Sequence, residues 1–300
     1  MPIRINRCRM VVRQRPQYLA VILSLIALLP VTGTAQQHPQ RIVSVVPALT
    51  EALFAIGASD QIVGVGSFDT IPAEIISLPR VGGLLDPDLE QIFSLRPDLV
   101  ILYGSQADQI EQLTRAGIAT FSYVHGGLAD SLSTLRRLGA RTGREAAAQQ
   151  VVSMIVARLA NLDISLRGRR RPRALLVFAR EPRSLRNIYA SGGVGFLHDM
   201  LEAAGGRNVL AHVARESIQL TSEAILTTAP EVIIELTYND RMTLDTQLAE
   251  RAVWNRLSAV PAVRNRRVHL LLGTHFVRPG PRLAEATTAI ARALHPNVVP

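Results

Sequence analysis

The sequence contains no lysine and a single cysteine, Cys8, and only 4% of its 300 residues are aromatic. Without lysine it cannot form a Walker-type phosphate loop, because that loop needs a lysine to reach the phosphates. A single cysteine excludes an internal disulfide framework and any zinc or iron–sulfur site built from several cysteines. With 48% apolar and 19% charged residues, the composition is typical of a globular chain rather than a disordered one.

Acidic residues are absent from the first 35 positions, which carry five of the 33 arginines. An uncharged apolar segment, 18–29, follows those arginines, and small residues occupy 31–35. This order predicts a secretory signal peptide over residues 1–35, cleaved after Ala35. A retained membrane anchor is disfavoured, since about twelve apolar residues fall short of the ~20 needed to cross a bilayer. No cysteine stands at the cleavage point, so we expect a periplasmic protein without a lipid anchor.

Positive charge is concentrated in two places. Removing the signal lowers the net charge from +9 to +4, because five arginines and no acid are lost with it. Segment 167–186 then holds eight arginines against Glu181 alone, a net +7, which leaves −3 for the rest of the mature chain. The one aromatic residue among these arginines is Phe178, which belongs to an expected strand, so the segment lacks the interleaved aromatics of nucleic-acid-binding segments and we interpret it as a solvated turn. No nucleic-acid partner is expected.

Short apolar, β-branched segments alternate with helical ones in two blocks, which predicts an α/β fold with mainly parallel sheets. The expected strands are 41–46, 62–65, 99–103, 118–124, 174–178, 232–236 and 268–272, and the expected helices are 50–56, 106–116, 196–204 and 282–294. Between the blocks, apolar residues recur every three or four positions over 144–168 and predict one long helix. The predicted organisation is an N-terminal lobe over 41–140, the long helix over 144–168, and a C-terminal lobe over 172–296.

The two lobes share an internal pattern. Segments 89–101 and 222–234 each contain a glutamate near a helix start, a proline seven residues later, an acid and then a strand. Glu90 and Glu223 occupy the matching positions. Each would be stabilised by the positive end of its helix dipole. Their symmetry also suggests a two-point docking device for a basic partner, and both interpretations stay open.

Catalytic and metal-binding motifs are missing. The seven histidines include no pair with metal-ligand spacing, and no nucleophile elbow occurs, so no resident metal, no cofactor and no enzyme activity are predicted. His125 and His275 follow expected strands, where ligands bind in open α/β sheets. Two alternatives remain, a secreted enzyme that uses the cleft between the lobes and a signalling module that senses a ligand.

Several motifs together resemble the periplasmic iron-chelate and vitamin B12-binding proteins, the substrate receptors of ABC importers. The resemblance covers residues 41–296 and is carried by 41–57, 78–83 and 89–100 in the first half and by 189–193, 203–206 and 222–226 in the second. It implies two α/β lobes joined by one rigid helix, with a metal chelate held between them. It also implies a soluble monomer that delivers this ligand to an inner-membrane ABC permease.

The cobalamin receptors are the most similar subtype, so the resemblance implies a corrinoid such as vitamin B12 as the ligand, with haem or a ferric siderophore as alternatives. By motif, the ligand-binding positions fall on Phe68, Tyr189, His275, Phe276 and Arg278, and the docking positions on Glu90 and Glu223. If the ligand were haem, Tyr189 and His275 are candidate axial ligands. Two positions where cobalamin receptors carry tryptophan hold Leu84 and Ser217 instead, which weakens the expected stacking on a corrin.

Overall fold

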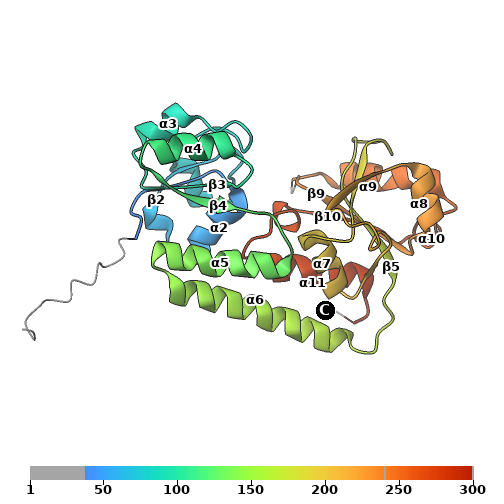
Figure 1. The fold of residues 1–300 in the computed structure, drawn as a ribbon. Coiled ribbons are helices and arrows are strands. Elements are labelled where there is room, and N and C mark those ends of the chain that lie inside the picture. Colours follow the sequence, from blue (N-terminus) through green and yellow to red (C-terminus); the bar gives the residue numbers. More distant parts are fainter. Residues whose placement is uncertain (1–37, 240, 299–300) are drawn as a thin grey trace, which may run out of the picture. The chain divides into compact units, whose positions relative to one another are not determined.

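The computed structural model describes residues 38–239 and 241–298, so the predicted signal peptide lies outside the described residues. Figure 1 shows two α/β lobes within this part of the chain, each built around one sheet, with long helices running beneath them. The predicted fold class is confirmed. None of the helices in the described part is both long and apolar enough to cross a membrane.

The N-terminal lobe contains a four-stranded parallel sheet in the order β2-β1-β3-β4. Its strands are β1 (Ile42–Ser44), β2 (Ile62–Val65), β3 (Leu99–Tyr103) and β4 (Ala119–Tyr123). Its helices are α2 (Pro47–Ala55), α3 (Leu89–Ser94), α4 (Ala107–Arg115) and α5 (Leu128–Thr142), with 3-10 turns η1 (Ser59–Gln61) and η2 (Ala73–Ser77). Residues of β1 and β3 alternate between two core clusters, which is why these two strands are mainly apolar on both faces.

The C-terminal lobe contains a six-stranded sheet in the order β10-β9-β5-β6-β8, with β7 paired to β5. Its strands are β5 (Arg173–Ala179), β6 (Ile188–Ser191), β7 (Arg207–Asn208), β8 (Ser217–Leu220), β9 (Val232–Thr237) and β10 (Val268–Leu272). Its helices are α7 (Phe196–Ala203), α8 (Ser222–Thr228), α9 (Leu244–Ala252), α10 (Pro261–Arg264) and α11 (Leu283–Leu294), with η3 (Val253–Leu257) and η4 (Thr274–Phe276). Strands β6 and β8 form one edge of the sheet, and the pairs β5–β6 and β6–β8 are antiparallel whereas the other pairs are parallel.

The long helix predicted over 144–168 is α6 (Glu145–Leu166), which is about 33 Å long at 1.5 Å per residue. Its first half places Val151 and Ile155 in the core of the N-terminal lobe, and Leu162 belongs to a core cluster of the C-terminal lobe. One helix therefore contributes to both cores. Helix α5, which the sequence did not predict, packs along α6, and Gly139 of α5 lies directly against Ala148, where a larger residue would clash.

Seven of the eight arginines in the basic segment 167–186 are exposed, as expected for a solvated segment, and Arg180 is the exception. Arg180 is 2% exposed and forms ion pairs with Glu235 at 2.9 Å and Glu250 at 2.7 Å. Trp254 donates its indole N–H to Glu235 at 2.8 Å, so the charged group is enclosed by the C-terminal lobe. Burial of a charged side chain requires this compensation by acids. Part of the apparent excess of positive charge is therefore structural.

Candidate ligand-binding cleft and docking helices

Residues of both lobes line one cavity of about 180 Å³, which we call the His125 cavity. The N-terminal lobe contributes His125, which follows β4, and the C-terminal lobe contributes the other lining residues. These are Phe178, Val194, Gly195, Phe196, Leu197, Glu216, Ser217, Tyr238 and Val277. The lining is mainly apolar with a few polar groups, as in small-molecule sites. A cavity of this size accommodates one edge or substituent of a large ligand rather than all of it.

His125 is held at the end of β4 by aromatic neighbours. Its Nδ1 lies 3.1 Å from the Tyr123 hydroxyl, and its ring meets Phe196 edge to face at 5.0 Å. Burial lowers the pKa of His125, although the nearby Glu216 carboxylate opposes this effect. Burial likewise raises the pKa of Tyr123, which remains a phenol. His125 therefore presents a neutral imidazole to the cavity at pH 7.

Glu216 is the only charged residue in the lining of the His125 cavity, and it is exposed there. Within the described residues, no hydrogen bond or ion pair engages its carboxylate. Gly195 has φ +88°, and a Cβ there would lie 3.0 Å from Cγ of Glu216, so glycine lets this side chain approach the start of α7. The glutamate is thus positioned by backbone geometry and left free to contact a ligand.

A second cavity, of about 350 Å³, belongs to the N-terminal lobe and is called the Phe68 cavity here. It is lined by Pro47, Phe68, Leu84, Leu85 and Asp86. Phe68 is 63% exposed and Leu85 is 87% exposed, so two large apolar side chains face solvent side by side in this cavity. The surface offered here is apolar apart from one carboxylate.

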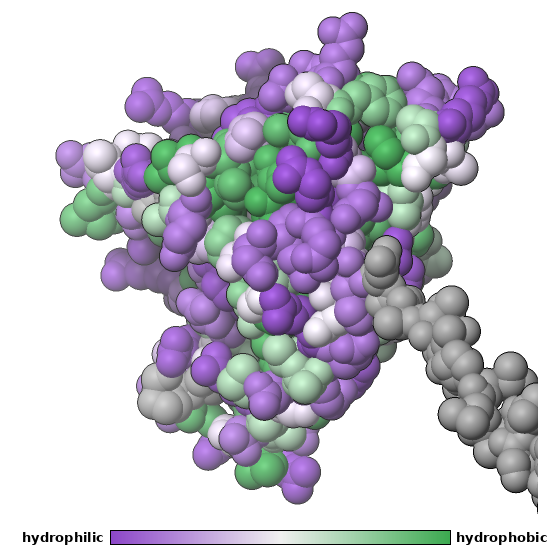
Figure 2. Space-filling view, turned by 90° about the vertical axis from the view of Figure 1, so that its left-hand side faces the viewer, coloured by the Kyte–Doolittle hydropathy of each residue, from purple (hydrophilic) through white to green (hydrophobic). Residues whose placement is uncertain are grey.

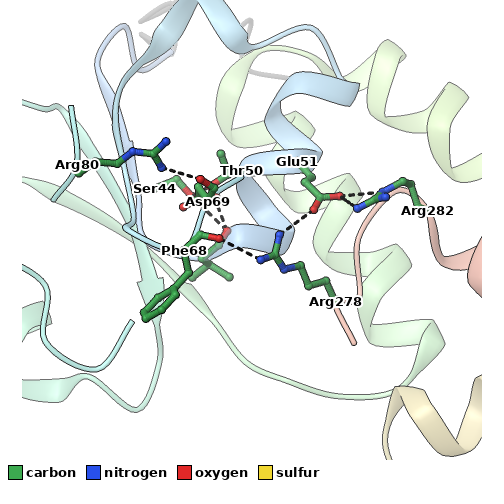
Figure 3. Close-up of polar contacts among 9 residues, drawn as sticks. Ser44, Thr50, Glu51, Phe68, Asp69, Arg80, Arg278 and Arg282 are labelled. Carbon is green, nitrogen blue, oxygen red and sulfur yellow. Dashed lines mark hydrogen bonds and ion pairs between the residues drawn. The ribbon is translucent and has the colours of Figure 1, made fainter. Parts of the chain in front are cut away.

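Arg278 links the two lobes near both cavities (Figure 3). It donates to Glu51 of α2 at 3.2 Å and to the carbonyl of Phe68 at 3.0 Å. Arg282 binds the second oxygen of Glu51 at 2.9 Å. A Cβ added at Gly280 would lie 3.3 Å from the Ala48 carbonyl oxygen, so the chain carrying both arginines approaches α2 closely. We call Glu51, Arg278 and Arg282 the interlobe latch.

Asp69, next to Phe68, is a buried carboxylate. It is 2% exposed, and neither oxygen has a hydrogen-bond partner of acceptable geometry in the described part of the chain. Burial raises its pKa to about 6, against the opposing effects of Thr50, Arg278 and Arg80. Arg80 instead donates to the carbonyls of Gly66 at 3.0 Å and Asp69 at 2.7 Å (Figure 3). These bonds fix the loop that presents the Phe68 ring.

Glu90 and Glu223 lie in equivalent helices, α3 and α8, and both are exposed. Both helices are capped at the start by a side chain that precedes them. The Asp88 carboxylate accepts a hydrogen bond from the Gln91 N–H at 2.9 Å, and the Thr221 hydroxyl accepts one from the Ala224 N–H at 3.2 Å. Because both caps are already supplied by other side chains, neither glutamate is needed as the N-cap.

The ends of α3 and α8 are also built alike. Arg96 and Ala229 both adopt the left-handed conformation, with φ of 46° and 43°. Arg41 donates to the Leu95 carbonyl at 2.7 Å, and Arg173 donates to the Thr228 carbonyl at 2.6 Å. The internal repeat seen in the sequence is therefore a structural repeat of one supersecondary unit.

Each repeat also exposes an apolar residue one turn after its glutamate. Phe93 is 37% exposed and Leu226 is 42% exposed. Hydrophobic side chains are visible near the top of the N-terminal lobe in Figure 2, at the level where Figure 1 places α3 and α4. Each lobe thus presents a glutamate and an apolar side chain on one short helix.

Comparisons with known proteins agree with this architecture. A family model described as periplasmic binding protein matches residues 42–272, more than three quarters of the chain. The chain belongs to the periplasmic binding protein family. An uncharacterized ABC transporter substrate-binding lipoprotein of Bacillus subtilis is 30% identical over 271 residues, which cover 88% of this chain and 82% of the relative.

Two further relatives carry names that state a ligand. A vitamin B12-binding protein of Salmonella typhimurium is 28% identical over 273 residues, which cover 90% of this chain and 96% of the relative. The solved structure of a periplasmic haem-binding protein from Roseiflexus, in apo form, has a TM-score of 0.72 and 26% identity, covering 86% of this chain and 98% of that one. Similarity to proteins with different ligands does not decide between the two.

Within this periplasmic binding protein, the structure separates the predicted ligand-binding residues. Phe68 lines a cavity, whereas Phe276 is 4% exposed and packs in the core of the C-terminal lobe, so its ring does not line either cavity. Arg278 is engaged by the latch. Tyr189, on β6, is 37% exposed and lies beside the cavity residue Phe178, with ring centroids 6.5 Å apart. His275 is half-buried and packs on Phe276, and burial lowers its pKa.

Sequence reasoning missed Glu216 and Tyr238 as cavity residues. Tyr238 directly follows β9, so the rule that favoured His125 would also have found it. No local signal marks Glu216. Leu84 and Ser217, the two positions with tryptophan in cobalamin receptors, line the Phe68 cavity and the His125 cavity respectively.

Among the described residues, no group of three histidine, cysteine or acidic side chains could hold a metal ion.

Proposed function

We propose that this protein is the substrate receptor of an ABC importer and that it binds a metal chelate, preferentially a corrinoid such as vitamin B12, between its lobes. The observation that carries the proposal is a pair of mainly apolar cavities, one lined by residues of both lobes and the other by the N-terminal lobe, which the Val277–Arg278 segment connects. Val277 lines one cavity, and Arg278 binds the backbone of the residue whose ring lines the other. A large, flat, amphipathic ligand could contact both surfaces at once.

The relatives support a ligand of this chemical kind. One is named for vitamin B12 and another for haem, both large metal macrocycles. The aromatic side chains of Phe68, Phe178 and Tyr238 would contact the face or edge of such a macrocycle. Haem or a ferric siderophore is the alternative within the same function, with Tyr189 and His275 as candidate axial ligands for haem iron.

The partner in this proposal is an inner-membrane permease that receives the ligand. Glu90 and Glu223 would bind basic residues of that permease, one from each lobe, while the receptor itself acts as a monomer in the periplasm. Residues 1–35 would direct export and be removed after Ala35. The single cysteine, Cys8, lies within that segment, so no lipid would be attached to the mature chain.

Calorimetry of the mature protein with cyanocobalamin tests the proposal. We expect micromolar or tighter binding with one ligand per chain. Haem and ferric siderophores are titrated in parallel, and tighter binding of either would replace the corrinoid by that ligand within the receptor function. Absence of heat with every chelate would contradict the receptor function itself. The visible absorption spectrum of protein purified from its native periplasm gives an independent check, because corrinoids and haem have distinct bands.

A further inference from the structure

Near the two cavities, Arg80, Arg278 and Arg282 are engaged by the protein itself, whereas the carboxylates of Glu216 and Asp86 are free. Neither cavity has an arginine in its described lining, while each contains one acid, Glu216 or Asp86. Both acids are exposed, and neither carboxylate forms a hydrogen bond or ion pair within residues 38–239 and 241–298. The remaining polar side chains of the His125 cavity are uncharged at pH 7.

These three arginines are occupied. Arg278 and Arg282 share the two oxygens of Glu51, which is 7% exposed, and Arg80 donates to backbone carbonyls. If an anionic ligand bound Arg278 instead, the buried carboxylate of Glu51 would keep only Arg282 as an ion-pair partner. Separating a buried ion pair in this way is strongly unfavourable. The arginines of the interlobe latch are therefore not available to neutralise an anionic ligand.

We infer that the cleft selects neutral or cationic metal chelates over anionic ones, and that Glu216 is the counter-charge that a cationic chelate meets. The inference rests on the proposed receptor function and adds the charge of the ligand to it. Glu216 lines the same cavity as His125. Its side chain packs against Gly195, the residue before α7, where a larger residue would be in the way. An electroneutral or cationic corrinoid satisfies this requirement, whereas haem with two propionates does not.

Three corrinoids that differ in charge test the inference: cyanocobalamin, which is neutral, its monocarboxylate, which is anionic, and aquacobalamin, which is cationic at pH 7. We expect affinity to fall from aquacobalamin to cyanocobalamin to the monocarboxylate. Glu216→Gln should weaken aquacobalamin binding about two- to fivefold, strengthen monocarboxylate binding by a similar factor and leave cyanocobalamin nearly unchanged, as one exposed charge pair would. Added salt should reduce these differences.

Glu74→Gln is the matched control, because Glu74 is exposed and lines neither cavity. Absorption spectra recorded alongside would detect coordination of cobalt by His125, and His125→Ala then isolates the effect of charge. A wild-type preference for the monocarboxylate, or equal effects of Glu216→Gln on all three corrinoids, overturns the inference and leaves the receptor function intact.

A cationic ferric hydroxamate and an anionic ferric catecholate extend the test beyond corrinoids. If no corrinoid binds but the cationic hydroxamate binds better than the catecholate, the charge rule survives and the corrinoid assignment fails. If haem or the anionic catecholate is the preferred ligand, the charge rule is wrong while the receptor function stands. Absence of binding by every chelate overturns both.

Discussion

At the scale of single residues, the cleft combines groups that are positioned with groups that are left free. Asp69 is the clearest case of a residue whose environment opposes its charge, since both carboxylate oxygens are buried without a hydrogen-bond partner in the described structure. Its neighbours Arg80 and Arg278 bind the loop backbone rather than the carboxylate. Hydrogen bonds from Arg80 and Arg278 to main-chain carbonyls thus hold the loop that carries Phe68. The carboxylate of Asp69 is left buried, which disfavours its ionised form.

We expect Asp69→Asn to stabilise the protein at high pH. Burial raises the pKa of Asp69 from its ordinary value of 3.8 to about 6, so the folded state binds the proton more tightly than the unfolded chain does. Stability from this group is therefore greatest below about pH 4 and falls as pH rises through 6, by up to about 3 kcal/mol. Urea unfolding at about pH 8 should show the gain for Asp69→Asn, and unfolding at about pH 4 should show little.

Asp86→Asn serves as the control, because Asp86 is exposed and its replacement should have little effect at either pH. If Asp69→Asn were less stable than the wild type at high pH, the ionised carboxylate would be held favourably by the nearby arginines. The assignment of Asp69 as a destabilised charge would then be incorrect.

At the scale of secondary-structure elements, the repeated α3 and α8 units separate two explanations of their glutamates. The N-caps belong to Asp88 and Thr221, and the Arg41 and Arg173 side chains bind the C-terminal carbonyls. Both helices are therefore fixed without Glu90 or Glu223. Within its own helix, each glutamate then contributes only a favourable interaction with the helix dipole, worth about 0.3–1 kcal/mol.

We predict that the Glu90→Ala/Glu223→Ala double variant retains ligand affinity and loses transport. Two charge-assisted contacts to a permease would be removed, each worth about 1.5–3 kcal/mol, so ligand uptake should fall tenfold or more. Uptake of the bound chelate into vesicles that contain the cognate permease measures the effect. The ligand affinity of the variant is measured separately by calorimetry.

Asp108→Ala/Asp245→Ala is the matched control for that experiment. Asp108 and Asp245 are exposed acids in the first turns of α4 and α9, one in each lobe, so their removal costs the same helix-dipole interaction. Unchanged uptake by the Glu90→Ala/Glu223→Ala variant would restrict the glutamates to a local role in their helices.

Elements with strong local patterns were predictable from the sequence, and elements defined by their neighbours were not. The segments 99–103 and 268–272 are strands with the predicted boundaries; the first is an apolar run that fits a buried parallel strand, and the second is a half-buried strand at the edge of its sheet. Helix α5 was missed because its buried face includes Ser131 and Gly139, which contact other elements without an apolar signature. The short strands β6 and β8 were missed because each has only four residues and carries exposed positions, so neither gives a continuous apolar run.

The candidate site was predictable only where residues follow strands. His125 and Tyr238 occupy such positions, whereas Glu216 reaches the cavity through a loop between β7 and β8. The role of Arg278 depends on Glu51, a residue 227 positions away in the sequence. Contacts over such separations are determined by tertiary packing, so a motif can identify Arg278 as part of the cleft without showing that an acid already binds it.

At the scale of the whole described molecule, the interlobe latch joins helix α2 of one lobe to the segment preceding α11 of the other. Ala284, at the start of α11, also packs in the core of the N-terminal lobe. The lobes are therefore joined at this point as well as through α6. A latch at the cleft couples two properties, the stability of the lobe arrangement and the charge available to a ligand.

This coupling predicts that one substitution both lowers the stability of the protein and raises its affinity for anionic chelates. Glu51→Gln leaves Arg278 and Arg282 without their acid, which should lower the free energy of unfolding by about 3 kcal/mol. The freed Arg278 can then bind a carboxylate, so affinity for haem or for cyanocobalamin monocarboxylate should rise about tenfold, the size of a good charge-assisted hydrogen bond. Urea unfolding and calorimetry measure the two effects on the same preparation.

The double variant Glu51→Gln/Arg278→Gln distinguishes release of Arg278 from general loosening of the cleft. Removing the unpaired arginine should restore part of the lost stability and abolish the gain in affinity for anionic chelates, because the group that binds them is gone. If Glu51→Gln leaves anion affinity unchanged, the latch does not withhold Arg278 from ligands. If the gain persists in the double variant, the anion binds elsewhere, since a carboxylate that depends on Arg278 must lose its partner when that side chain is neutral.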